Sequence, residues 1–368
     1  NDGLLIFSAI CRRWTWDHEA IAAKPIASNA VSLTIDMMRR SYDQGVQNAL
    51  RISALLGVSF KKEILERLFL LYEYGSKSDF DLCIESAVAG GIISEDGDGL
   101  LRFSHDQLYQ AACALTPSEE QALAHLDIGR RLLRSAGEDI NGLGSDFVTT
   151  TVDQYNEGAS LITDHAEKLR LAELNLIAGE AALNSASFLS AAIYLLRGCG
   201  LIGTDDWKSH YDVCLRLFTF CSEAQLTQGM AEGALTSANE VLKHGKNFHD
   251  ELPANQALLT AFTIQGNYSN AIVHGMSVLK EFGEDFPTDA DEQQAASRTE
   301  LMRICAVLGS KSFDDIFNQN PMESDSMQIL SMQLLMVVSR IAYLNEPTLM
   351  LLLVFRMVSK SMSSGLTA

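Results

Sequence analysis

His105 and Asp106 are the two neighbouring side chains best placed for chemistry in this sequence. They follow a stretch from Gly91 to Phe103 that reads as a β-hairpin, and they stand where the next helix is expected to begin. Backbone N–H groups at a helix N-terminus favour an anion, so this pair could contact an anionic group. The structural alternative is that Ser104 caps the helix while Asp106 merely complements its dipole.

The other reactive residues do not form a recognisable catalytic site. The remaining histidines show no HExxH pattern, so we expect no metal site. There is no GxSxG, and no cysteine stands in a nucleophile context, so we expect no catalytic residues. A GxxxxGK[ST] loop is absent, and the nearest glycine-rich segment, Gly142-Leu143-Gly144, lacks the following lysine. The sequence therefore predicts a chain that is not an enzyme and holds no cofactor.

Arg130, Arg131 and Arg134 form the densest basic cluster. Three guanidinium groups on one helix could clamp a phosphate or an acidic partner. The alternative is a solvated face near a helix C-terminus, where cations interact favourably with the dipole.

The composition indicates an acidic globular chain. Its 368 residues suffice for two or three domains, and 47% hydrophobic residues supply their cores. A net charge of -19 repels polyphosphate and anionic membranes, so we expect protein partners and no nucleic acid. The longest apolar run, Leu349 to Phe355, is too short for a membrane span. Seven scattered cysteines without a CxxC pair suit buried thiols in the cytoplasm.

Residues 1–44 are expected to form a hairpin followed by a helix. Leu4 to Phe7 returns as Arg13 to Trp16, which places both tryptophans of the second strand on one face. The helix is expected from about Asn29 to Arg40.

Residues 45–116 show the order helix, helix, helix, hairpin, helix, which is winged-helix topology. The third helix carries Leu82, Ala87 and Val88 as its apolar positions and ends at Gly90-Gly91. The hairpin turns through Asp96 to Gly99, where glycines tolerate positive φ.

Winged helices often read DNA with their third helix, so the charge of this helix matters. It runs from Ser78 to Ala87 and has no basic residue beyond Lys77 at its entrance. Asp79, Asp81 and Glu85 would oppose DNA phosphates, which argues against DNA binding.

Residues 117–368 read as a helical repeat array of tetratricopeptide type. Three segments share one spacing: a small residue, then an aromatic or small residue two positions later, then an alanine three positions after that. The motif recurs about every 40 residues. The segments are Ala186-x-Phe188-x-x-Ala191, Gly229-x-Ala231-x-x-Ala234 and Gly266-x-Tyr268-x-x-Ala271. The acidic linker 283–292 interrupts the array, and helices resume from about Gln293.

Three capping boxes are expected to start helices between residues 104 and 167. They are Ser104 with Gln107, Thr116 with Glu119 beside Pro117 at the first helical position, and Asp164 with Glu167. The helices from Pro117 and from Asp164 also carry Gly129 and Gly179 within apolar stripes, where a small residue lets helices pack closely.

Several motifs along nearly the whole chain resemble one known family. They are Gly3-Leu4-Leu5, Trp14-x-Trp16-Asp17, Phe103-Ser104-His105-Asp106-Gln107-x-Tyr109-Gln110-Ala111-Ala112, His125-x-x-Ile128-Gly129-Arg130-x-Leu132-Leu133, Leu171-Ala172-Glu173-Leu174-Asn175-Leu176-x-Ala178-Gly179, Pro321-Met322 and Leu353-x-x-Arg356-Met357-Val358. The family comprises large signalling proteins that combine a protein-kinase-like region, an AAA-type NTPase of the STAND group, a helical arm and often a histidine kinase. The sequence departs from the family at Arg40-Ser41-Tyr42, where a Leu-Pro pair is usual.

The resemblance places this chain just after the NTPase core. It implies that an upstream domain binds ATP or ADP with magnesium, and that His105 of the winged helix reaches the bound diphosphate. Residues 1–44 would then be the end of the NTPase module, 45–116 the winged helix and 117–368 the tetratricopeptide-like arm.

We therefore expect a mainly α chain without catalysis of its own, an internal piece of a larger cytoplasmic ATPase and kinase. Its expected function is to couple nucleotide state to a signalling output through contacts with the upstream and downstream domains and with protein partners. The alternative function is a winged-helix transcription regulator with a helical sensing domain, which would need a basic recognition surface.

Overall fold

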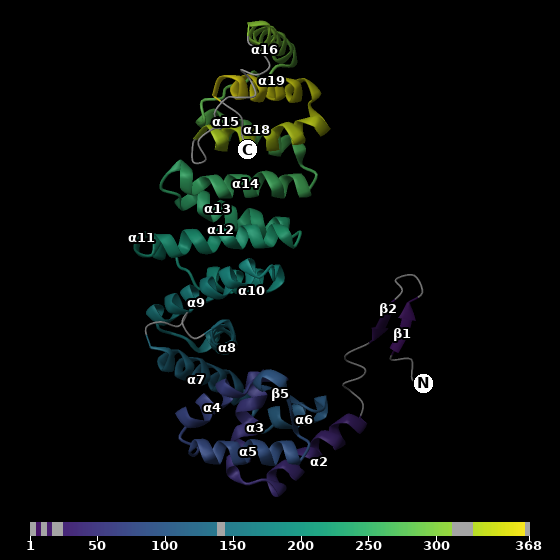
Figure 1. Ribbon diagram of the computed structural model, residues 1–368, viewed down its shortest axis with the longest axis vertical. Helices are drawn as coiled ribbons and strands as arrows, with labels where there is room; N and C mark the ends of the chain where they lie inside the picture. The colour runs from purple at the N-terminus through teal and green to yellow at the C-terminus, as the bar shows by residue number, and fades with distance from the viewer. Residues whose placement is uncertain (1–4, 9–12, 17–24, 138–143, 311–326, 365–368) are drawn as a thin grey trace. The chain divides into compact units, whose positions relative to one another are not determined.

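The computed structural model describes residues 5–8, 13–16, 25–137, 144–310 and 327–364, and these are mainly α-helical (Figure 1). The chain divides into two compact units, Asn1–Leu174 and Asn175–Ala368. The boundary falls inside helix α9 (His165–Asn184). The expectation of a mainly α fold is confirmed.

The hairpin expected at the start of unit 1 is present. Strand β1 (Leu5–Ser8) pairs antiparallel with β2 (Arg13–Trp16), and Leu5 and Phe7 stand opposite Trp16 and Trp14. The surroundings of the two tryptophan side chains lie outside the described residues. Helix α2 (Pro25–Ser41) begins earlier than expected, at a proline whose missing N–H is not needed in the first turn.

A compact module of helices and short strands follows. In chain order it contains α3 (Gln44–Leu56), β3 (Ser59–Lys61), α4 (Lys62–Leu71), α5 (Lys77–Ala89), β4 (Ile93–Asp96), the 3₁₀ turn η1 (Gly97–Gly99), β5 (Leu100–Phe103) and α6 (Asp106–Cys113). The strands form one antiparallel sheet of order β3-β5-β4. The expected order of helices and hairpin is confirmed, but the sequence analysis missed β3, which is three residues long and runs directly into α4.

The turn between β4 and β5 lies where it was expected. Asp98 and Gly99 have φ of 65° and 68°, the left-handed region that a tight hairpin turn requires. Helix α5 likewise ends at Gly90, and Gly91 follows with φ of 69°.

The buried face of α5 differs from the expected one. Of the expected apolar positions, Ala87 is buried, but Leu82 is 61% exposed and Val88 is 38% exposed. The helix instead buries the i, i+3, i+4, i+7 set of Phe80, Cys83, Ile84 and Ala87. Phe80 determines this face because its ring packs on Phe69 of α4, with centroids 5.5 Å apart.

Two of the three expected capping boxes are wrong. The Ser104 N–H donates to the carbonyl of Ile92, so Ser104 still belongs to the hairpin and His105 becomes the N-cap of α6. The Thr116 side chain is buried with an unpartnered hydroxyl, and Pro117 takes the N-cap of α7 (Ser118–Ala136). The third box is half confirmed, because the Glu167 N–H donates to Asp164 at 2.9 Å.

Two glycines allow α7 to pack closely on α8 (Ser145–Glu157) and on the 3₁₀ turn η3 (Ala159–Leu161). A Cβ at Gly129 would lie 2.8 Å from the Tyr155 ring, and one at Gly158 would lie 2.5 Å from the Leu126 Cβ. The expectation that Gly129 permits close packing is confirmed, and in unit 2 a Cβ at Gly179 would meet Leu195 at 2.6 Å.

Unit 2 consists of helices that pack mostly on their neighbours in the chain. After α9 these are α10 (Phe188–Cys199), α11 (Asp206–Ser209), α12 (Tyr211–Thr227), α13 (Ala231–His244), α14 (Phe248–Ile264), α15 (Tyr268–Glu281), α16 (Ala290–Ser310), α18 (Met327–Asn345) and α19 (Pro347–Ser364).

The three expected repeat segments share one local geometry. Ala186, Gly229 and Gly266 have φ of 56°, 71° and 72°, and each ends one helix of a pair. The next residue has ψ of 63° in all three turns, and its N–H bonds to the carbonyl five residues back. The alanines that follow, at 191, 234 and 271, are fully buried.

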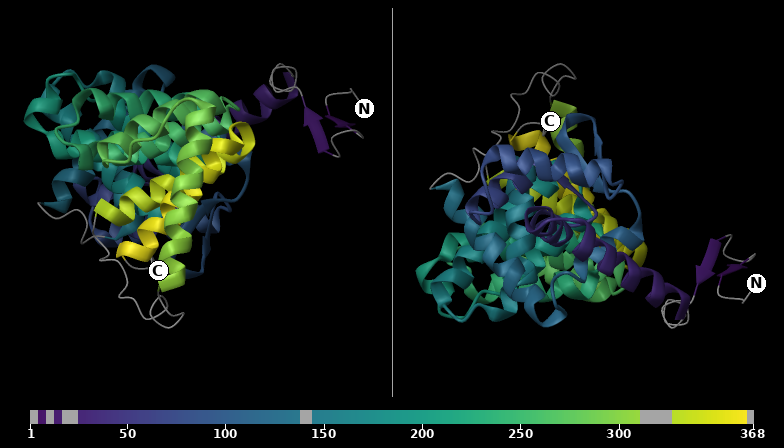
Figure 2. Two further views of the ribbon diagram at one scale, coloured as in Figure 1. Left: turned by 90° about the horizontal axis from the view of Figure 1, so that it is seen from above. Right: turned by 90° about the horizontal axis from the view of Figure 1, so that it is seen from below.

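The end of the array departs from chain order. Helix α15 packs on α18, α18 packs on α19, and α16 packs on α19 rather than on α15. Figure 1 shows α16 beyond α19, and Figure 2 shows it lying across the yellow α18 and α19 pair. The acidic linker that was expected over residues 283–292 is shorter, because α16 begins at Ala290.

Helix α18 has the length and the apolar composition that a membrane-spanning helix needs. Its Leu334, Leu335 and Val338 are fully buried in an apolar cluster with side chains of α15 and α19. The packing of α18 in the array is that of a core helix.

The expectation of buried thiols holds for half of the described cysteines. Cys83, Cys214 and Cys221 are buried, while Cys113 and Cys199 are half-buried and Cys305 is exposed on α16. Cys11 lies outside the described residues.

Candidate functional site: the α7 junction

His105 and Asp106 lie at the start of α6 with exposed side chains. Neither side chain forms a hydrogen bond or ion pair with any other residue that the structure describes. The dipole of α6 favours the Asp106 carboxylate in its first turn. His105 is thus open to contact from another domain, and its role in sensing a nucleotide stays a prediction.

The arginine cluster is largely paired within the protein. Arg131 Nε donates to Asp127 at 2.8 Å, and its Nη1 donates to the carbonyl of Leu71 at 2.8 Å. The same guanidinium lies 4.2 Å from the centre of the Tyr72 ring, and the Tyr72 hydroxyl donates to Asp127 at 2.7 Å. These contacts bind α7 to the end of α4, so Arg131 is not available as a phosphate clamp.

The neighbouring Arg130 makes a second set of contacts across three helices. Its Nε and Nη2 donate to the two oxygens of Glu167 at 2.7 and 2.8 Å, the paired geometry that arginine and carboxylate favour. The Tyr155 hydroxyl donates to the same carboxylate at 3.0 Å. Side chains of α7 and α8 therefore converge on the first turn of α9.

A third contact reaches α3. Gln154 of α8 donates to the carbonyl of Leu55 at 2.8 Å, and its side-chain oxygen lies 2.8 Å from His125 Nδ1 on α7. We call these three sets of contacts, formed by Tyr72, His125, Asp127, Arg130, Arg131, Gln154, Tyr155 and Glu167, the α7 junction. All of it lies in unit 1. The sequence analysis singled out its arginines as a possible binding cluster and Glu167 as a capping residue, but it did not predict that they pair.

Burial and pairing shift the acidities of the α7 junction in opposite directions. Burial alone would raise the pKa of Asp127, but hydrogen bonds from Arg131 and Tyr72 outweigh it and hold that pKa below its ordinary value. The bond from Arg130 lowers the pKa of Glu167. Burial, followed by the bond to Glu167, raises the pKa of Tyr155 to about 12. Burial, followed by the bond to Asp127, likewise raises the pKa of Tyr72. Both carboxylates thus stay charged and both phenols stay protonated at neutral pH.

A cavity of about 560 Å³ lies in the same unit, between α4, the hairpin turn and the start of α8. Its charged lining residues are Lys61, Glu63, Arg67, Asp98 and Asp146, and Lys61 Nζ lies 3.6 Å from Asp146. Because carboxylates outnumber cations in this lining, the cavity does not favour a polyphosphate.

The exposed face of α5 is acidic and partly apolar. Asp79 and Glu85 are exposed beside Leu82, and Lys77 is paired with Glu66 at 2.8 Å. A DNA-reading helix needs donors for phosphates and base edges, whereas the carboxylates of Asp79 and Glu85 only accept and would repel phosphate.

Comparisons with known proteins give one significant similarity. The chain is 21% identical to hybrid signal transduction histidine kinase G of Dictyostelium discoideum, across 77% of this chain. It spans about 10% of the length of that protein. No protein-family model matches the sequence, and no solved structure matches it.

Proposed function

We propose that this chain is a non-catalytic coupling and protein-interaction region of a larger, ATP-dependent signalling protein in the cytoplasm. The similarity to a hybrid signal transduction histidine kinase supports the signalling role. The proposal includes an upstream STAND-type NTPase, which would bind ATP or ADP with magnesium, and a downstream sensor kinase. Nothing in the proposal requires a catalytic residue of this chain.

Two features of the fold support the proposed domain types. The order α3-β3-α4-α5-β4-β5, with β5 between β3 and β4, is the arrangement expected of a winged helix. The three equivalent turns after α9, α12 and α14 are typical of tetratricopeptide-like helix pairs. The exposed Leu82 and Val88 of α5 suit contact with a protein better than contact with DNA.

The α7 junction is the observation that carries the proposal. Hydrogen bonds and ion pairs connect α3 and α4 with α7, α8 and α9, so a displacement of the small module is transmitted to the first helices that follow it. Transmission between sites needs such a contiguous network of packed and bonded side chains.

The test uses the full-length protein that contains this chain. Arg131→Met removes the contacts with Asp127 and Leu71, and we expect it to abolish the dependence of kinase output on nucleotide while nucleotide affinity stays unchanged. Arg216→Met, which removes an ion pair with Glu180 on exposed helix surfaces, is the matched control. Unchanged nucleotide-dependent output in Arg131→Met would refute the coupling role of the junction.

His105 has its own test in the same protein. If His105 senses the diphosphate, His105→Ala speeds ADP release, because a contact to the bound nucleotide is lost. ADP release at the wild-type rate would contradict nucleotide sensing by His105, whose role would then be that of the N-cap of α6.

The alternative function, a winged-helix transcription regulator, predicts binding to duplex DNA that weakens steeply with salt. We expect no such binding, because Asp79, Asp81 and Glu85 face the approach of a phosphate backbone along α5. A fluorescence-anisotropy titration with duplex DNA at low and high salt distinguishes the two functions.

A further inference from the structure

Helix α16 is fastened at the end of the array mainly by polar contacts. Three of its four buried residues are polar, namely Gln293, Ser297 and Glu300, and Ile304 is the apolar one. Among the described elements, α19 is the one against which α16 packs extensively. The only α16 residue that packs on the apolar cluster of the surrounding helices is the half-buried Ala296.

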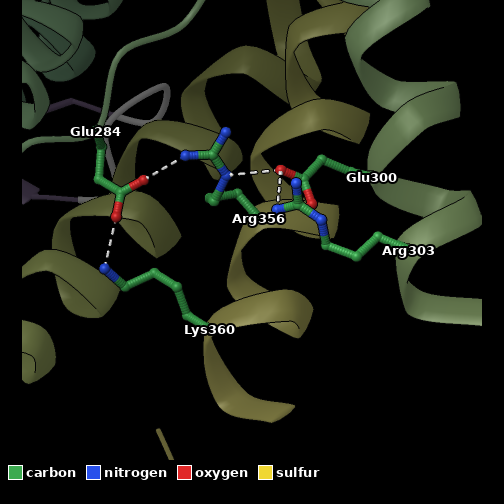
Figure 3. Close-up of polar contacts among 5 residues, drawn as sticks. All are labelled: Glu284, Glu300, Arg303, Arg356 and Lys360. Atoms are coloured by element: carbon green, nitrogen blue, oxygen red, sulfur yellow. Dashed lines mark hydrogen bonds and ion pairs between the residues drawn. The ribbon is translucent and has the colours of Figure 1, made fainter. Parts of the chain in front are cut away.

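An ion-pair network, which we call the ionic latch, joins α16 and the preceding linker to α19 (Figure 3). It comprises Glu284, Glu300, Arg303, Arg356 and Lys360. Arg356 donates from Nη1 to Glu284 at 2.7 Å and from Nε to Glu300 at 3.2 Å. Lys360 donates to the other oxygen of Glu284. Arg356 is therefore the one side chain that holds both the linker and the helix.

The ionic latch is incompletely satisfied. Glu300 has a side chain that is only 9% exposed, and its Oε2 is buried without a hydrogen-bond partner among the residues that the structure describes. A buried carboxylate oxygen without a donor costs free energy that hydration would restore. Detachment of α16 would hydrate this oxygen, so the docked state carries a cost that the detached state does not.

The outward face of α16 carries large apolar side chains among its charged ones. Met302 is 71% exposed, and Leu301 and Leu308 are about half exposed. Most amphipathic helices of a soluble protein bury the apolar face and expose the polar one. Docking on α19 leaves Leu301, Met302 and Leu308 exposed and buries one large apolar side chain of α16, Ile304, so hydrophobic burial contributes little to holding α16 in place.

We propose that α16 is a detachable strap, held on α19 by the ionic latch and released as a unit while α12 to α14 stay folded. Release uncovers the side of α19 that carries Arg356 and changes the end of the array. The inference rests on the packing of unit 2 alone and is independent of the proposed signalling function.

Hydrogen exchange of the whole chain, read by mass spectrometry, tests the strap. In the unaltered protein under sub-denaturing urea, we expect the amides of 290–310 to exchange together, at least tenfold faster than those of 211–264. Equal protection of the two segments would overturn the proposal, whatever any variant does.

A matched set of variants tests the latch. Arg356→Met should raise exchange in 290–310 at least tenfold and leave 211–264 unchanged. Lys360→Met, which loses only the bond to Glu284, should have a smaller effect, and Arg216→Met should have none on α16. The double variant with Glu300→Leu and Arg356→Met should exchange more slowly in α16 than Arg356→Met alone, because no carboxylate is left without a partner on α16. Unchanged exchange in α16, or equal acceleration throughout unit 2, contradicts the latch.

Discussion

The α7 junction and the ionic latch both centre on an arginine, but they differ in how completely their charged groups are partnered. At the junction, Asp127 accepts from both Arg131 and Tyr72. In both regions the arginine also lies over an aromatic ring, Tyr72 for Arg131 and Phe286 for Arg356. In the latch, Arg356 serves two carboxylates and one oxygen of Glu300 has no donor. Ion pairs of the same residue types can thus form a fully partnered contact between helices or an incompletely partnered one that is easier to release.

The packing around the two sites also differs, and it is closer at the α7 junction than at the ionic latch. Gly129 and Gly158 bring α7 and α8 into close contact around the junction, whereas polar side chains fill most of the contact between α16 and α19. Ion pairs add little to stability when they stand alone, so the neighbouring packing decides which contact is durable.

The largest expected difference between the two regions is in the loss of stability when a glycine is replaced by alanine. Gly158→Ala places a Cβ 2.5 Å from the Leu126 Cβ and 2.7 Å from the Ala122 carbonyl oxygen, neither of which is a flexible group. We expect a loss of about 1–3 kcal/mol in the free energy of unfolding, measured by urea denaturation followed by circular dichroism.

Gly309→Ala in α16 is the matched substitution for that measurement. No atom lies within 4 Å of a Cβ there, so the better helix propensity of alanine should raise stability by up to about 1 kcal/mol. A loss as large as that of Gly158→Ala would mean that α16 is packed as tightly as α8.

Substitutions in the three repeated turns should change the stability by an intermediate amount. These turns belong to the body of the array and not to the strap α16. Ala186 has a φ of 56°, which strains an L-residue, so Ala186→Gly should stabilise the protein by about 1 kcal/mol. Gly229→Ala and Gly266→Ala should destabilise it by a similar amount, because each introduces that strain. Thermal denaturation measures the change in melting temperature for each of the three variants. A change in the same direction for all three would show that the turns are not equivalent.

The smallest expected effect is the response to acid. The pKa values of Asp127 and Glu167 are lowered in the folded protein, from ordinary values of 3.8 and 4.5. Their contribution to stability is therefore full above those ordinary values and is lost as the pH falls through the lowered ones. Urea midpoints at neutral pH and at about pH 3 should differ less in Arg130→Met than in the unaltered protein, since the bond to Glu167 is gone. A pH dependence that Arg130→Met leaves unchanged would contradict this assignment.

Local geometry was the part of the structure that the sequence could predict. The turns at Ala186, Gly229 and Gly266, the hairpin turn at Asp98 and Gly99 and the end of α5 depend on residues close together in the chain. Glycines carry that information because they reach positive φ without strain, and small residues because they permit close contact.

The errors arose where a distant contact competes with a local one. Ser104 has the right spacing for a cap but bonds into the hairpin through Ile92. Leu82 has the right character for a core but loses its place to Phe80, whose partner Phe69 lies on another helix.

The candidate sites show the same limit. The sequence pointed to Arg130 and Arg131, and one acceptor of Arg131, Asp127, lies only four residues away. The acceptors that join α7 to other helices, Glu167 and Leu71, lie 37 and 60 residues away. The bond between Arg356 and Glu284 joins residues 72 apart, and no spacing rule connects them.

The packing of α16 on α19 also sets an order of events during synthesis. The helix that ends at Ser310 leaves the ribosome well before α19, which runs from Pro347 to Ser364, has been made. At ordinary translation rates the delay is roughly 3 to 10 seconds. For that interval the buried polar side chains of the nascent α16, Gln293, Ser297 and Glu300, lack the helix on which they pack, so this segment is open to chaperones and to pairing with the wrong surface.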